Sequence, residues 1–289
     1  NNTFLGSFAG NANGNAVSNT FVGAFSGTNT TSGAGNTFVG KESGISNDNG
    51  NDNTFVGKLA GAANVTGLFN TFVGESAGAS NVDGDYNTFI GKLARNASLV
   101  NENVFVGYRA GFANTTSIHN TYVGNNAGEN SISGNNTFIG YQSGLSNTTG
   151  DENTFIGVLA GHFNITGDNN VFMGNDAGEM NANGFFNTFI GGKSGRNNVN
   201  DSNTFVGYES GFATTSGSQN TFLGRSAGDF NNTGGNNTCI GDDADLSVNN
   251  LSNASAFGSN AISNSSNKIR IGSTTVTVIE GQVDWTFPS

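Results

Sequence analysis

The chain has 289 residues, among them 45 glycines and 24 phenylalanines but one proline and one cysteine. Its net charge is −11 and its ten basic residues are scattered, which excludes the clustered Lys and Arg that nucleic-acid binding needs. The lone Cys239 excludes an internal disulfide framework, and the lack of a long apolar run predicts no membrane insertion.

A glycine recurs along almost the whole chain at a nearly constant step, and three of the steps, such as Gly91 to Gly107, are shorter by one. A period this short is too small for a helix pair or a propeller blade, but it fits one coil of a β-solenoid. We therefore predict an all-β fold, a parallel β-solenoid or β-roll of about 16 coils of 16–17 residues, over residues 1–262. The sixteen glycines are Gly6, Gly23, Gly40, Gly57, Gly74, Gly91, Gly107, Gly124, Gly140, Gly157, Gly174, Gly191, Gly207, Gly224, Gly241 and Gly258.

The three residues before each glycine are Thr-Phe-Val or a close variant, all strong strand formers, so a short strand is predicted there. Side chains alternate across a strand, which places Phe on one face and Thr with Val on the other. Both faces are apolar, and one coil has only one interior. We therefore expect a side-by-side homotrimer that buries one ladder inside each coil and the other between chains; the sequence leaves open which is which. The phenylalanine ladder comprises Phe21, Phe38, Phe55, Phe72, Phe89, Phe105, Phe138, Phe155, Phe172, Phe189, Phe205 and Phe222.

Other positions of the coil are also constant. Asparagine precedes nearly every strand, as at Asn19, Asn36 and Asn53, and stacked copies are expected to form a ladder of amides that both donate and accept. An Ala or Ser three residues after each glycine predicts a second short strand, packed tightly against the first. The position after the glycine carries Lys58, Glu75 and Lys92 in successive coils, which predicts stacked opposite charges.

Two groups of aspartates are candidate metal ligands. Asp151 and Asp168 occupy the same position in consecutive coils, where stacked like charges are compatible with a bridging Ca²⁺. The alternative is that both are turn residues on a solvated edge. Asp242, Asp243 and Asp245 cluster where the Phe ladder ends at Cys239, and there a polar cap is the alternative to a metal site. No other cofactor is expected.

The residue pattern does not predict an enzyme. His119 and His162 occupy different coil positions, and no nucleophile–base pair stands out. Scattered carboxylates leave a carbohydrate-active enzyme as an alternative. An ice-binding face is another alternative, although Thr shares its face with Val or Ile and is therefore expected to be buried.

The period breaks after Gly258, because the next glycine, Gly272, comes too early for a full coil. An alternating segment over residues 274–281 predicts a strand. Residues 263–289 are therefore expected to cap the solenoid, with Trp285 and Phe287 covering its open end.

Two resemblances concern the repeats and this tail. The repeats, Ser252-Asn253-Ala254-Ser255-Ala256-Phe257-Gly258-Ser259-Asn260-Ala261 above all, resemble the left-handed β-roll in the head of trimeric autotransporter adhesins. The coils here are longer and richer in Phe. The segment 267–289 resembles the region just before the self-cleaving intramolecular chaperone domain of endosialidase and tail-spike fibres.

The resemblance implies a mature homotrimer whose chaperone was released by cleavage after Ser289. It implies an extracellular location, on a cell surface or virion, and a structural or adhesive fibre that attaches to a cell-surface glycan or receptor. A self-polymerising extracellular filament is the alternative.

Overall fold

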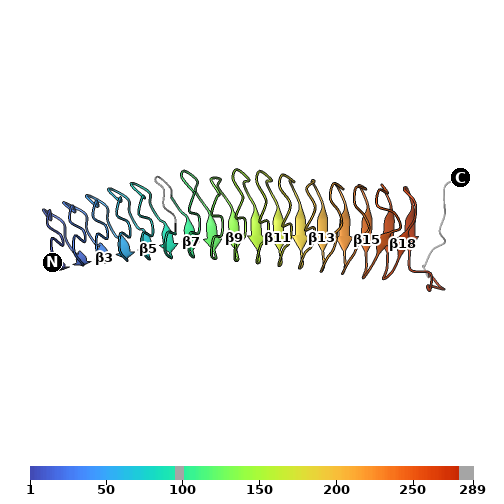
Figure 1. Ribbon diagram of the computed structural model, residues 1–289, viewed down its shortest axis with the longest axis horizontal. Helices are drawn as coiled ribbons and strands as arrows, with labels where there is room; N and C mark the ends of the chain where they lie inside the picture. Colours follow the sequence, from blue (N-terminus) through green and yellow to red (C-terminus); the bar gives the residue numbers. More distant parts are fainter. Residues whose placement is uncertain (95–100, 280–289) are drawn as a thin grey trace.

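The computed structural model describes residues 1–94 and 101–279, and this part of the chain contains strands and turns but no helix. The coils stack along one axis from the N-terminus to the C-terminus, and their strands lie side by side along one edge of the rod (Figure 1). Together they form one 17-stranded parallel sheet, which confirms the predicted parallel β-solenoid. Its strands are β1 (Thr3–Leu5), β2 (Thr20–Val22), β3 (Thr37–Val39), β4 (Thr54–Val56), β5 (Thr71–Val73), β6 (Thr88–Ile90), β7 (Val104–Val106), β8 (Thr121–Val123), β9 (Thr137–Ile139), β10 (Thr154–Ile156), β11 (Val171–Met173), β12 (Thr188–Ile190), β13 (Thr204–Val206), β14 (Thr221–Leu223), β15 (Thr238–Ile240), β17 (Ser255–Phe257) and β19 (Ile269–Ile271).

The phenylalanine at the centre of each strand points into the coil and forms the core. Phe38 and Phe55 pair in register, are completely buried, and stack with ring centroids 4.8 Å apart and planes 6° apart. Tyr122 continues the same column, and its hydroxyl finds a buried partner in Ser131 at 2.8 Å. The Phe ladder is thus inside the coil, and the Thr and aliphatic side chains face outward.

The position after each strand must be glycine, because the backbone of the next coil lies too close to leave room for a side chain. Gly23 has φ +135°, and a Cβ there would lie 2.5 Å from the carbonyl oxygen of Gly40. Only a residue without a side chain allows successive coils to approach this closely. The predicted end of the strand at this glycine is therefore confirmed.

The predicted second strand in every coil is wrong. After the glycine, the described coils up to β15 form turns, as over residues 58–63. Leu59 adopts a left-handed conformation with φ 60°, and this reversal prevents an extended segment. The small Ala60 or Ser43 is still buried against the core, and the Ser43 hydroxyl donates to the Phe55 carbonyl at 3.1 Å. Among the described residues, a second sheet is formed by only two strands, β16 (Asp245–Leu246) and β18 (Ile262–Ser263).

Two buried columns of asparagine connect the coils. Asn53 donates from Nδ2 to the Gly67 carbonyl at 2.7 Å and accepts the Asn70 backbone N–H at 2.9 Å. A second column lies seven residues after the glycine, where Asn64 Nδ2 donates to Asn47 Oδ1 at 2.8 Å. The first column is therefore mainly an amide-to-backbone ladder, and the second links amide to amide.

The sheet continues beyond the last regular coil. β19 pairs in parallel with β17 and places Ile269 opposite Ser255, so the last coil is shorter than the others. Residues up to Ile271 therefore belong to the same sheet as the shaft. Of the segment 274–281 predicted as a strand, the described part, residues 274–279, is turn and irregular chain. Trp285, Phe287 and Ser289 lie outside the described residues.

Candidate functional site: the outer face of the sheet and its edges

The outer face of the long sheet carries two columns of side chains. Threonine occupies the position three before the glycine and an aliphatic residue the position just before it. These side chains remain partly exposed, for example Ile90 at 39% and Leu223 at 46% of their full accessibility. Thr54 is exposed in the single chain, so the Thr column is not buried inside the coil, and its burial between chains stays a prediction. The face is a continuous ribbon of hydroxyl and aliphatic groups.

One edge of this face is formed by the residues five before each glycine. Their side chains are exposed, and most of the backbones are left-handed, as at Asp52 with φ 55° and His119 with φ 61°. Neighbouring members of the column touch, because the coils repeat at the spacing of sheet strands. Phe69 and Tyr86 stack with centroids 5.1 Å apart.

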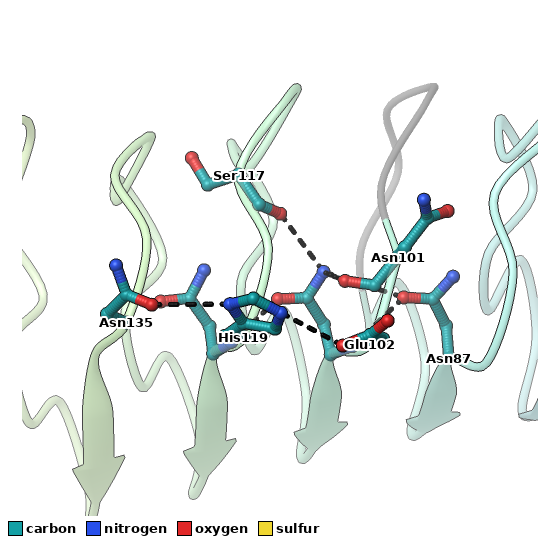
Figure 2. Close-up of polar contacts among 8 residues, drawn as sticks. Asn87, Asn101, Glu102, Ser117, His119 and Asn135 are labelled. Atoms are coloured by element: carbon teal, nitrogen blue, oxygen red, sulfur yellow. Dashed lines mark hydrogen bonds and ion pairs between the residues drawn. The ribbon is translucent and has the colours of Figure 1, made fainter.

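Within this edge, His119 lies between two coils and contacts both (Figure 2). Its Nε2 lies 2.9 Å from Glu102 Oε2, and its Nδ1 lies 3.3 Å from Asn135 Oδ1. The Ser117 hydroxyl donates to the Ile132 carbonyl instead of to the imidazole, so the group contains no Ser–His pair. Sequence reasoning missed this cluster, although the signal was available: His119, Glu102 and Asn135 occupy the same position in successive coils.

The opposite edge is formed by the two residues after each glycine, and it carries most of the ion pairs. Lys92 Nζ lies 2.9 Å from Glu75, and this contact is the main reason that the pKa of Glu75 is lowered; the charge of Lys58 adds to the effect. Arg109 and Lys193 form similar pairs with acidic residues of the next coil, Glu129 and Glu209, at 2.6 and 3.1 Å. The exposed Lys92–Glu75 pair adds little stability, whereas the Arg109–Glu129 and Lys193–Glu209 pairs are partly buried; all three favour correct coil register.

The candidate metal ligands Asp151 and Asp168 do lie in adjacent coils, but one oxygen of each accepts a backbone N–H. Asp168 Oδ1 accepts the Asp151 N–H at 2.8 Å, and Asp151 Oδ1 accepts the Gly134 N–H at 2.8 Å. Each carboxylate caps the preceding coil, which matches the turn-residue interpretation.

The second aspartate group is held by an arginine and by backbone amides. Arg225 pairs with Asp242 at 2.8 Å and also with Asp243. Asp245 accepts the N–H groups of Leu246 and Phe230, and burial raises its pKa to about 7. Over residues 1–94 and 101–279, no three or more His, Cys, Asp or Glu side chains gather as metal ligands would.

Two remaining reactive groups lie apart from these clusters. Cys239 is buried beneath Asp245 at the end of the ring column, where desolvation raises the pKa of its thiol. His162 contacts the Gln142 carbonyl at 3.3 Å and the edge of the Phe163 ring. In the described part of the chain, neither joins a nucleophile–base arrangement.

A scan of family models and a search of curated proteins both found no match to this chain. In the described residues, no helix has the length and hydropathy needed to span a bilayer.

Proposed function

We propose that this chain is a segment of an extracellular structural fibre in which three copies pack side by side through the outer faces of their long sheets. The observation that carries the proposal is the outer ribbon itself. From β1 to β14, each strand presents an aliphatic side chain or Met173 at the position before its glycine, and these side chains are partly or fully exposed, while the opposite face is already filled by the ring column. A repeated apolar surface of this kind is typical of a protein–protein interface.

The size of the ribbon supports a stable association. Seventeen strands spaced about 4.8 Å apart give a length of about 77 Å, and three strand residues give a width of about 10 Å. The product, about 770 Å², is the area that each copy would share between its two neighbours, and in total it is similar to the roughly 800 Å² that one partner contributes to a standard two-chain interface. Three such faces meeting around one axis leave no copy with an open apolar ribbon.

The role proposed for this trimer is mechanical and adhesive rather than enzymatic. A rod whose described coils are joined by backbone and amide ladders, and up to β14 by stacked rings, suits a stiff shaft on a bacterial surface appendage or a phage-like tail fibre. Its exposed turns, away from the sheet and its edges, would then present side chains to a cell-surface glycan or receptor. End-to-end association into a filament is a variant of this role.

The test is the native mass of the purified chain, measured by light scattering on a sizing column. A mass of three times 29.5 kDa is expected. The variant Ile139→Arg places a charge on the outer ribbon and should reduce the mass to that of one chain while the β-sheet circular dichroism is kept. Thr149→Arg, in an exposed turn, is the matched control and should remain trimeric. A wild-type monomer or dimer would overturn the proposal.

The exposure of threonine favours one second candidate, an ice-binding face. The partly exposed Thr column supplies a regular array of hydroxyl groups, which the sequence-based expectation of burial had argued against. This function needs the ribbon to be free, so it requires a monomer. A monomeric mass together with thermal hysteresis that Thr121→Lys abolishes would favour it over the fibre.

A further inference from the structure

The two edges of the outer face carry complementary side chains in the same coil. Asp52 lies on one edge of β4 and Lys58 on the other, and both are exposed. Neither forms an ion pair within the described part of the protomer. The strand between them, Thr54–Val56, alone spans about 10 Å, so the two residues of one chain are too far apart to pair with each other.

Threefold closure brings these two edges together between copies. This step rests on the trimer proposed above. When three ribbons face one axis, the leading edge of each ribbon meets the trailing edge of its neighbour, because rotation preserves the direction of the strands. A closed ring also requires zero axial shift between neighbours, since equal non-zero shifts would produce an open helix. The same coil of each chain therefore lies at the same height.

The side chains along the edges fit this arrangement. In register, Asp52 of one copy faces Lys58 of the next. Phe186, which is 65% exposed, faces Gly192, the coil in which the position after the glycine has no side chain.

A shift of one coil toward the C-terminus would destroy the fit. It would oppose Asp52 to Glu75, and Glu152 to the Asn175–Asp176 pair. Such like-charge encounters disfavour the wrong register.

We propose that these edge residues set the register of the assembly: the Asp52 carboxylate of one copy binds the Lys58 ammonium of its neighbour, and Phe186 packs over the neighbour's Gly192. The ribbon supplies most of the apolar contact, and the edges decide which coils lie opposite each other.

The test is disulfide trapping in a Cys239→Ala background. Asp52→Cys with Lys58→Cys should give a covalent trimer on a non-reducing denaturing gel after mild oxidation. A disulfide within one chain is excluded, because Cα atoms more than about 7 Å apart are not bridged. The control pair, Asp52→Cys with Glu75→Cys, reports a one-coil shift and should remain uncrosslinked.

The outcomes separate this inference from the proposed function. Light scattering is measured on each unoxidised variant. A native trimer that crosslinks through the control pair, or through neither pair, overturns the register and leaves the fibre intact. A monomeric mass overturns the fibre itself. A covalent trimer from the Asp52–Lys58 pair alone supports both.

Discussion

At the level of single residues, the phenylalanine of each strand and the glycine six residues later are coupled through one ring. Gly161 is left-handed with φ 57°, and a Cβ on it would lie 2.5 Å from the Phe155 ring. Asp245 and Ile262 replace this glycine where Cys239 and Ala256 replace the aromatic residue, whereas Arg95, which follows Phe89, lies outside the described residues. Smaller side chains at the centre of the strand therefore permit a Cβ above them.

We predict that Gly161→Ala lowers the free energy of unfolding by about 2–4 kcal/mol, because it combines the left-handed strain of alanine with overpacking against Phe155. In a Phe155→Cys background the same change should cost only about 1–2 kcal/mol, since the ring is gone and the left-handed strain alone remains. Urea unfolding followed by circular dichroism gives both values as a double-mutant cycle. Equal costs in the two backgrounds would contradict the coupling.

Asp245 gives the fold a dependence on pH. Burial raises its pKa to about 7, and the charges of Asp229 and Asp243 act in the same direction. A carboxyl group with a raised pKa binds its proton more tightly when folded, so it destabilises the fold as pH rises from about 4 to about 7.

Asp245→Asn keeps an oxygen acceptor for the Phe230 and Leu246 amides but removes the charge. We expect it to raise the free energy of unfolding at pH 8 by about 1–3 kcal/mol, since one pKa unit corresponds to about 1.4 kcal/mol. At pH 4 it should have little effect. Thermal unfolding at a series of pH values would show a flatter profile for the variant, and an unchanged slope would show that another group titrates.

At the level of the element, each coil depends on buried amides more than on its three-residue strand. Asn53 supplies both a donor and an acceptor to the next coil, at 2.7 and 2.9 Å. The Gly67 carbonyl retains a second donor, Asn64 Nδ2 at 3.2 Å, whereas the Asn70 N–H has its bond to Asn53 alone among the described contacts. Loss of the side chain would therefore leave one buried N–H unpaired.

We predict that Asn53→Ala lowers the free energy of unfolding by about 2–3 kcal/mol. Asn130→Ala makes the same chemical change at an exposed turn position away from both edges and should cost under about 0.5 kcal/mol. Chemical denaturation of both variants provides the comparison. Similar small losses for the two would show that water or a rearranged backbone replaces the ladder.

The sequence predicts the strands well and the turns poorly, for physical reasons. Thr-Phe-Val before a glycine is a strong strand signal, and the stacked Asn19, Asn36 and Asn53 follow from the period alone. The sequence did not decide which face of the strand points into the coil, because both faces are apolar. The second strand was wrong because residues such as Leu59 are left-handed here, a conformation that their own side chains disfavour and that contacts between coils impose.

At the level of the whole molecule, the proposed trimer rests on the Thr and aliphatic ribbon. The sequence predicts one apolar ladder that the coil does not bury, and the structure identifies it as the Thr and aliphatic columns, because the rings lie inside the coil. The position of the edge residues around His119 and Asp52 could be read from the period, but their exposure could not, because it depends on the path of the turns.

The constant register between coils also makes the length of the rod depend directly on the number of residues in the chain. Each coil meets only copies of itself, so the removal or duplication of one whole coil restores the same ring, amide and backbone partners at the junction. The removal or duplication of one coil would therefore change the length of the rod by about 4.8 Å. The length of the rod is therefore proportional to its number of coils.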